Sequence, residues 1–216
     1  MDLSILVFGF LPLGILLMLA AGVLYVLSAI WLWNSSRGES IDLVNALIAF
    51  LLYQAVAKFS MGLGAYTSNP LFGKIAALAI IIGAVYMLKF PLSVLSQWSR
   101  KVLFRVIFII SILGFAWFMG TPERQDLLVF FATWYDIILN GVIVGGTIIV
   151  FGIKSANRVY KTKAVGGGSG VVSCCVAANV SMLSGAALAS LVFGFLSPIL
   201  ILGSMLFVRN QSQSNS

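Results

Sequence analysis

The sequence predicts an all-α membrane protein, a polytopic bundle of transmembrane helices. Hydrophobic residues make up 61% of the 216 residues and charged residues only 9%, and the mean hydropathy is +1.09. A soluble domain carries roughly 25% charged residues, so this chain has too little polar surface to cover a water-soluble core. The apolar runs are long and do not alternate with polar residues, which favours helices of about 20 residues over barrel strands.

The composition also narrows the chemistry. The chain has no histidine, which removes the commonest general base and most haem and zinc sites. Cys174 and Cys175 are adjacent within an apolar run, where we expect buried thiols rather than a disulfide. None of the 6 acids forms a pair suited to metal binding or to acid–base catalysis. We therefore expect no enzymatic activity, no cofactor and no metal site.

The basic residues indicate a membrane environment rather than a nucleic-acid partner. The net charge is +7, and the Lys and Arg residues lie singly or in small groups at the ends of apolar runs. At those places they can contact anionic headgroups, and no basic stripe with interleaved aromatic residues suggests base stacking. We expect the partner to be the lipid bilayer of a cell or inner membrane.

Three spans are predicted in the first half of the chain. The first covers 5–33, where Pro12 should kink the helix because it removes a backbone hydrogen bond. The second covers 42–66 and is closed by a tight polar turn before the third, which covers 71–89. Apolar residues at helical spacing within 91–101 then indicate a short helix lying in the membrane interface.

Further spans are predicted over 102–120 and 126–153. The remaining apolar stretch, 171–208, is too long for one span and barely long enough for two. We expect two, with a turn between Ser184 and Pro198. Seven spans result, and six is the alternative. Together they form one domain over residues 1–208, followed by a loose polar tail over residues 209–216.

The segment between the fifth and sixth spans is predicted to be a basic loop followed by a flexible linker. Its cations are Lys154, Arg158, Lys161 and Lys163. The run Gly166–Gly170 that follows lacks the strand and the lysine of a phosphate-binding loop, so its glycines indicate a flexible connection. We expect the basic loop to face lipid headgroups in the cytoplasm.

The distribution of charge predicts the orientation of the chain. The first, third and fifth loops carry most of the cations, whereas the connectors on the other side carry only Lys74 and Arg124. Cytoplasmic loops are enriched in Lys and Arg. The N-terminus is therefore predicted outside, and with seven spans the C-terminus lies in the cytoplasm.

Lys58 and Asp136 are the candidate intramembrane polar pair. Each lies at a depth of about 12–15 Å below the outer end of its span, because a helix rises about 1.5 Å per residue. An unpaired charge in hydrocarbon costs at least about 2.5–3.5 kcal/mol, which favours an ion pair between the two side chains. Gln54 lies one turn from Lys58 and Asn140 one turn from Asp136. The alternative is that Lys58 reaches outward and Asp136 lies at the headgroup level.

Small residues predict two close-packing helix faces. Gly141 and Gly145 form a GxxxG pattern in the fifth span. The second face is a row of small residues that recur every four positions through the sixth span. This spacing predicts a helix that is continuous to the last residue of the row and a turn close to Gly194. Its members are Ser173, Ala177, Ser181, Gly185 and Ala189. Packing within the monomer and packing between subunits both fit these faces.

Two function classes follow from these features. The first is a membrane-embedded subunit of a larger assembly of the secretion, conjugation or respiratory type, associated with other membrane subunits or with copies of itself. It follows from the small-residue faces, the short loops and the basic loop. The second is a small channel or transporter that uses the polar site around Lys58 and Asp136. The sequence favours the first class.

Overall fold

The computed structural model describes residues 6–7, 11–35, 41–93, 95–119, 131–132, 134–184 and 187–214. Within these ranges the chain is helical, apart from short turns and a two-residue antiparallel pairing of β1 (Leu6–Val7) with β2 (Leu11–Pro12). The predicted all-α class is confirmed. The first long helix begins directly after Pro12, so this proline precedes the helix and does not kink it as expected.

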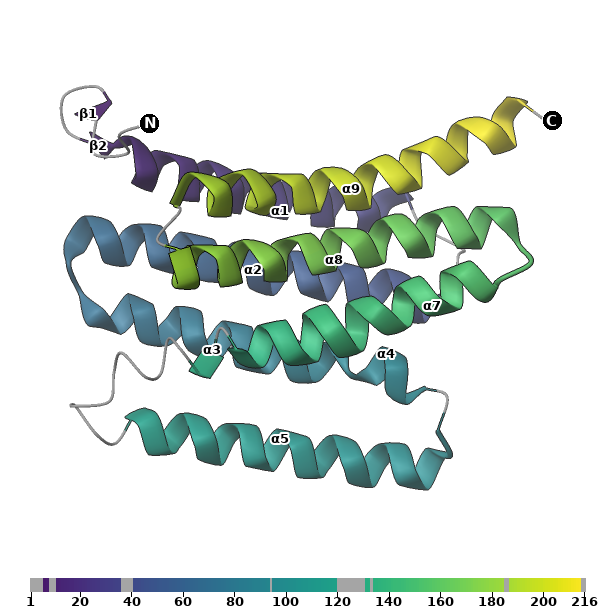
Figure 1. Cartoon of the computed structure of the whole chain (residues 1–216), viewed down its shortest axis with the longest axis horizontal. Coiled ribbons are helices and arrows are strands. Elements are labelled where there is room, and N and C mark those ends of the chain that lie inside the picture. The colour runs from purple at the N-terminus through teal and green to yellow at the C-terminus, as the bar shows by residue number, and fades with distance from the viewer. Residues whose placement is uncertain are drawn as a thin grey trace.

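The long helices run side by side and alternate in direction along the chain (Figure 1). Their bounds are α1 (Leu13–Ser35), α2 (Ile41–Thr67), α3 (Pro70–Met87), α4 (Lys89–Leu92), α5 (Gln97–Met119), the π-helix η2 (Ile137–Gly145), α7 (Gly146–Lys154), α8 (Arg158–Ser184) and α9 (Ala187–Ser214). Four stretches among the described residues are long and apolar enough to cross a membrane: Leu13–Ser35, Leu43–Thr67, Pro70–Leu92 and Trp134–Lys154. A shorter apolar helical stretch covers Gly194–Leu206.

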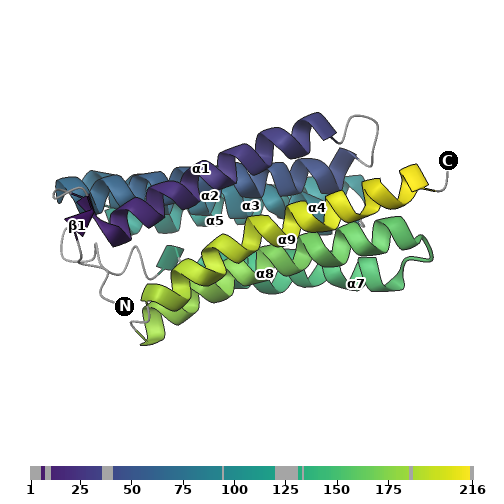
Figure 2. The ribbon, with the colours of Figure 1, turned by 90° about the horizontal axis from the view of Figure 1, so that it is seen from above.

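The helices form two layers, which Figure 2 shows from above. One layer contains α1, α2, α3 and α5, and the other contains η2 with α7, α8 and α9. Contacts between the layers join α1 to α9, α2 to α8 and α3 to η2. The helix α5 lies at one edge and packs against α3 and α4.

The tight turn between α2 and α3 lies where the sequence predicts it. Ser68 adopts φ 53°, a left-handed conformation that reverses the chain within a few residues. Asn69 caps α3 by accepting a hydrogen bond from the Leu71 amide at 2.9 Å, and Pro70 occupies the first helical position. Local side-chain chemistry therefore determines this helix end.

The prediction of a separate interfacial helix over 91–101 is wrong. Only the last two residues of the four-residue helix α4 fall in this segment, and its second half is already the start of α5. Ser96 explains the boundary, because its hydroxyl accepts a hydrogen bond from the Ser99 amide at 3.3 Å, as an N-capping residue does. Trp98 lies in the first turn of α5 with 76% of its surface exposed.

The predictions of a basic loop and a flexible linker are also wrong. Lys154 ends α7 and Arg158 begins α8, so only three residues connect the helices, and both Lys161 and Lys163 lie in α8. Asn157 starts α8 by accepting hydrogen bonds from the amides of Val159 at 2.9 Å and Tyr160 at 3.2 Å. The glycine run Gly166–Gly170 therefore continues a helix.

Close helix packing explains the glycines of α8. A Cβ atom on Gly170 would lie 2.7 Å from the carbonyl oxygen of Ser197 in α9, and one on Gly168 would lie 2.9 Å from the carbonyl oxygen of Gly145 in η2. Neither distance leaves room for a methyl group. Because helices in lipid gain no hydrophobic drive from associating, such backbone contact is a main source of stability.

The turn between the last two helices falls at the start of the predicted window. α8 ends at Ser184 and α9 begins at Ala187, so Gly194 and Pro198 lie inside α9 rather than at the turn. The predicted small-residue row is divided: Ser173, Ala177 and Ser181 belong to α8, Ala189 belongs to α9, and Gly185 lies outside the described residues. The expected loose tail is helical as far as Ser214.

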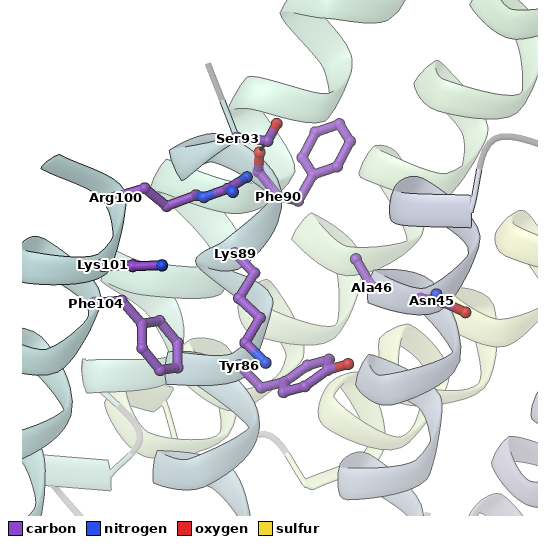
Figure 3. Close-up of a pocket in the computed structure, with 9 residues that line it drawn as sticks. All are labelled: Asn45, Ala46, Tyr86, Lys89, Phe90, Ser93, Arg100, Lys101 and Phe104. Atoms are coloured by element: carbon purple, nitrogen blue, oxygen red, sulfur yellow. Dashed lines mark hydrogen bonds between the residues drawn. The ribbon is translucent and has the colours of Figure 1, made fainter. Parts of the chain in front are cut away.

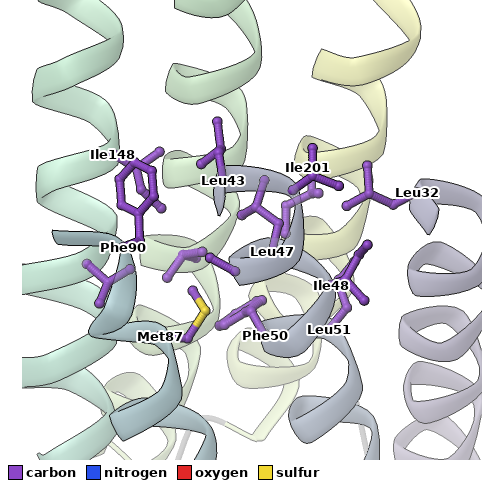
Figure 4. Close-up of a cluster of buried hydrophobic side chains, with 14 of the residues drawn as sticks. Leu32, Leu43, Leu47, Ile48, Phe50, Leu51, Met87, Phe90, Ile148 and Ile201 are labelled. Atoms are coloured by element: carbon purple, nitrogen blue, oxygen red, sulfur yellow. The ribbon is translucent and has the colours of Figure 1, made fainter. Parts of the chain in front are cut away.

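Buried apolar side chains from both layers meet around α2 (Figure 4). Leu47 and Phe50 of α2 are fully buried and belong to the same cluster as Met87 of α3, Ile148 of α7 and Ile201 of α9. The helix α2 therefore occupies the centre of the bundle and presents side chains to both layers. Polar residues on its inward face are consequently held away from solvent.

We predict that Gly170→Ala destabilises the protein and that Gly146→Ala does not. Overpacking of this kind costs about 1–3 kcal/mol. A Cβ on Gly146 would meet nothing within 4 Å, so this helical glycine is a matched control, and alanine there should slightly favour the helix. Thermal unfolding of both variants in detergent measures the difference. Equal stability of the two variants would contradict the packed helix and favour a linker.

Candidate functional site

Asp136 is buried in the centre of the bundle. It immediately precedes the π-helix η2 and only 3% of its surface is exposed, while Asn140, one turn further, is fully buried. π-helical segments are rare and occur frequently at functional sites. A carboxylate at this depth must be hydrogen-bonded, because burying an unsatisfied charge is costly.

Neutral donors surround the Asp136 carboxylate. Oδ1 accepts hydrogen bonds from the Asn140 amide at 2.6 Å and from the Tyr53 hydroxyl at 3.1 Å, and Oδ2 accepts one from the Gln54 amide at 3.3 Å. Asn140 also donates to the Tyr53 oxygen. Tyr53 and Gln54 are consecutive residues of α2. The hydrogen bonds therefore join the two layers of the bundle.

Lys58 lies near this site without pairing directly with Asp136. No ion pair within 4.0 Å joins these two described residues. The Lys58 Nζ instead lies 3.9 Å from the point that a Cβ on Gly194 of α9 would occupy. Of the predicted polar group, the structure brings Asp136, Gln54 and Asn140 together and leaves Lys58 to one side.

Two packing details fix the position of Tyr53. A Cβ on Gly83 of α3 would lie 2.0 Å from Cδ1 of Tyr53, so the missing side chain provides the space for the phenol ring. Phe50 packs edge-on against the same ring with the centroids 5.5 Å apart. The space at Gly83 and the Phe50 ring therefore hold the Tyr53 ring in place, so that its hydroxyl points to the Asp136 carboxylate.

A second buried polar cluster lies around Pro198 of α9. Proline has no backbone N–H, so the carbonyl of Gly194, four residues earlier, loses its usual partner within the helix. Tyr25 of α1 is fully buried and donates a hydrogen bond to this carbonyl at 2.9 Å. The hydroxyl of Tyr25 thus compensates for the proline, which explains how α9 continues through Pro198.

Adjacent cysteines on α8 connect the two clusters. The Sγ of Cys174 lies 3.3 Å from the Tyr25 hydroxyl, and the Sγ of Cys175 lies 3.8 Å from Oδ2 of Asp136. Both thiols are free and buried. Polar groups therefore form a nearly continuous line through the core from α1 and α9, across α8, to η2 and α2.

Sequence reasoning missed Tyr25, Tyr53 and the cysteines as members of the site. Tyrosines in membrane proteins are common at the interfaces, and a cysteine in an apolar run resembles a small hydrophobe. One signal was present for Tyr53, because it directly precedes Gln54 within a predicted span. Nothing local in the sequence distinguishes Tyr25.

The predicted packing face of η2 lies against α8 of the same chain. A Cβ on Gly141 would lie 3.0 Å from Cβ of Cys175, and one on Gly145 would lie 2.8 Å from Cγ2 of Val172. Ser173 is buried on the same helix. These described members of the small-residue faces therefore pack inside the monomer.

The Asp136 site offers one oxygen atom with free acceptor capacity, because the buried Asn140 Oδ1 has no hydrogen-bond partner among the described residues. Ser28 Oγ of α1 and Ser197 Oγ of α9 are also buried without a partner there. The same part of the chain contains no group of three His, Cys, Asp or Glu residues suited to a metal ion. Oxygen ligands of this kind suit a proton, a water molecule or a small hard cation.

Comparisons of the chain with protein-family models, with curated proteins and with solved structures gave no match.

We predict an energetic coupling of about 1–2 kcal/mol between Tyr53 and Asp136, near the upper end for hydrogen bonds inside membranes because one partner is a carboxylate. A double-mutant cycle with Tyr53→Phe and Asp136→Ala, read out by unfolding in mixed micelles, measures it. Tyr66→Phe is the control, since Tyr66 lies in the same helix but is 55% exposed. Additive effects of Tyr53→Phe and Asp136→Ala would show that the hydrogen bond contributes nothing.

We also predict that Pro198→Ala makes Tyr25→Phe less harmful. Loss of the Tyr25 hydroxyl should cost about 1 kcal/mol in the native background, because it leaves the Gly194 carbonyl without a partner. Alanine at position 198 supplies the missing N–H within α9. The same unfolding assay on the two single variants and the double variant tests this. An equal cost in both backgrounds would mean that Tyr25 does not serve this carbonyl.

Proposed function

We propose that the chain is a seven-span membrane protein with the N-terminus outside and the C-terminus in the cytoplasm. The helices α5, α8 and α9 would join the four apolar stretches as spans. The connections that follow α4 and α7 lie at the same end of the bundle as the C-terminus (Figure 1). Lys89, Arg100 and Lys154 belong to that end. This clustering of cations supports the proposed orientation.

We propose that the protein is a small transporter or channel whose core handles a proton or a small cation. The observation that carries this proposal is the buried Asp136 carboxylate, which is held by neutral donors and has no cation in direct contact among the described residues. Ionisable groups inside membrane spans commonly mark ion or proton pathways. A purely structural anchor would need no ionisable group, because an amide or hydroxyl could accept the same hydrogen bonds.

The position of the carboxylate between the two layers supports a coupling mechanism. Asp136 and Asn140 belong to one layer, whereas Tyr53 and Gln54 belong to the other. When a carboxylate takes up a proton, one of its oxygens becomes a donor and loses an acceptor position. One of the present donors would then lose its partner. Proton or cation binding at Asp136 would therefore change the hydrogen bonds between the layers and shift their relative stability.

A membrane-embedded subunit of a larger assembly is the second candidate. The edge position of α5 supports it. Among the described residues this helix packs against α3, α4 and the side chains of Phe131 and Tyr135, and it leaves a broad apolar face uncovered. The packing of Gly141 and Gly145 inside the monomer weighs against it. That glycine face was a main reason for the subunit interpretation, and it is already occupied by α8. The geometry thus favours the transporter or channel.

We predict that purified protein in proteoliposomes supports a proton or sodium flux that Asp136→Asn abolishes. The amide keeps the size of the side chain and removes its charge. Asp126→Asn, at the nearest acid along the chain, is the control and should retain the flux. A pH-sensitive dye and a sodium gradient report the two ions separately.

Two other outcomes distinguish the candidates. A native chain that shows no flux and is stable only with co-purifying membrane proteins would support the assembly subunit. A flux that persists in Asp136→Asn would remove Asp136 from the pathway. Size-exclusion profiles of the variants establish that each remains folded.

A further inference from the structure

A cavity of about 340 Å³ lies between α2, α4 and α5, and Asp136 and its hydrogen-bond partners are not part of its wall (Figure 3). Lys89, Arg100 and Lys101 contribute three cations to its wall, and Asn45 and Ser93 contribute neutral polar groups. The lining contains no carboxylate. A hollow of this size that gathers three positive charges without a counter-charge is suited to an anion.

None of the three cations is neutralised within the part of the chain that the structure describes. Lys89 contacts aromatic faces instead: its Nζ lies 4.1 Å from the ring centroid of Tyr86 and 5.3 Å from that of Phe104. Arg100 is half-buried, which makes an uncompensated charge more costly there than on an open surface. An anion in the cavity would relieve the mutual repulsion of the three side chains.

The cavity lies at the level where a membrane meets water. Lys89 is near the end of the apolar stretch Pro70–Leu92, and Arg100 and Lys101 lie in the first two turns of α5. Trp98, in the first turn of α5, is 76% exposed, as interfacial tryptophans are. A ligand that enters from the headgroup layer would therefore reach the cations directly.

An apolar surface continues from the cavity along the same side of α5. The ring of Phe104, which lines the cavity, stacks on the ring of Phe108 one turn further with the centroids 6.4 Å apart, and Phe108 is 41% exposed. An acyl chain could lie along these rings while its headgroup enters the cavity. A free phosphate would use the cations but would leave the rings uncovered.

We propose that this cavity binds the phosphate of an anionic phospholipid. Basic pockets between transmembrane helices on the cytoplasmic side are suited to such headgroups. Lys89, Arg100 and Lys101 bind the phosphate, Asn45 offers hydrogen bonds to its oxygens, and the Phe104 and Phe108 rings of α5 hold an acyl chain. The site is independent of Asp136 and of any flux through the core.

Native mass spectrometry of the full chain in mild detergent tests the proposal. The protein is titrated with phosphatidylglycerol or with phosphatidylcholine, and the retained lipid is counted. We expect one phosphatidylglycerol to be retained at concentrations where phosphatidylcholine is lost. The variant Lys89→Gln, Arg100→Gln, Lys101→Gln should weaken this retention at least about tenfold, since each cation contributes to binding the headgroup.

The matched control removes the same charges outside the cavity. Lys154→Gln, Arg158→Gln, Lys161→Gln also replaces one arginine and two lysines at the same end of the bundle, and none of these residues lines the cavity. It should bind phosphatidylglycerol within about twofold of the native chain, because distant charges are screened. Ser93→Phe is a second test: it fills the cavity from an exposed position without changing charge, and should also weaken retention.

Each contrary outcome overturns the proposal. Equal losses in the two triple variants would show general surface attraction. Equal retention of the two lipids would remove the headgroup preference. Displacement of phosphatidylglycerol by inorganic phosphate at equal concentration would make a soluble anion the occupant. If the Ser93→Phe variant retains phosphatidylglycerol as well as the native chain does, the lipid binds elsewhere. Thermal unfolding identifies any variant that has lost its fold.

Discussion

The fold depends on satisfying polar groups that lie far from water. In a bilayer the core offers no solvent to an orphaned carbonyl or carboxylate, so each needs a partner within the protein. This chain provides the partners across its layers: Tyr53 and Gln54 reach Asp136, and Tyr25 reaches the carbonyl that Pro198 leaves unpaired. These contacts specify how the layers face each other, because apolar packing alone would tolerate other registers.

The glycines serve the same arrangement by bringing backbones together. Gly168 and Gly170 let α8 approach η2 and α9, and Gly83 leaves room for the Tyr53 ring. Shorter distances between helices allow short side chains such as Asp and Asn to reach their partners. Close packing and the buried hydrogen bonds are thus two aspects of one constraint, and loss of either should loosen the other.

Much of the fold could be predicted from the sequence, and the site only in part. Long apolar runs specify helices, and the turn before Pro70 follows from local chemistry. The helical glycine run could not be predicted, because glycine disfavours helices and only contacts with neighbouring backbones reverse that preference. Counting residues placed Lys58 and Asp136 at similar depth but could not give the axial position of one helix against the other to within a turn. Gln54 lies one turn before Lys58 on the same face of α2, so the axial offset between α2 and η2 is why Gln54 and Tyr53, rather than Lys58, contact the carboxylate.

No cation contacts Asp136 directly among the described residues, and in the proposed transporter or channel this has an electrical consequence. An arriving proton or cation carries charge through part of the voltage that falls across the bilayer. A full crossing is worth about 2.3 kcal/mol per elementary charge for each 100 mV, and entry to mid-depth a corresponding fraction. If Asp136 binds a proton or cation as proposed, its occupancy would therefore respond to membrane polarisation, whereas a pre-neutralised pair at the same place would respond far less.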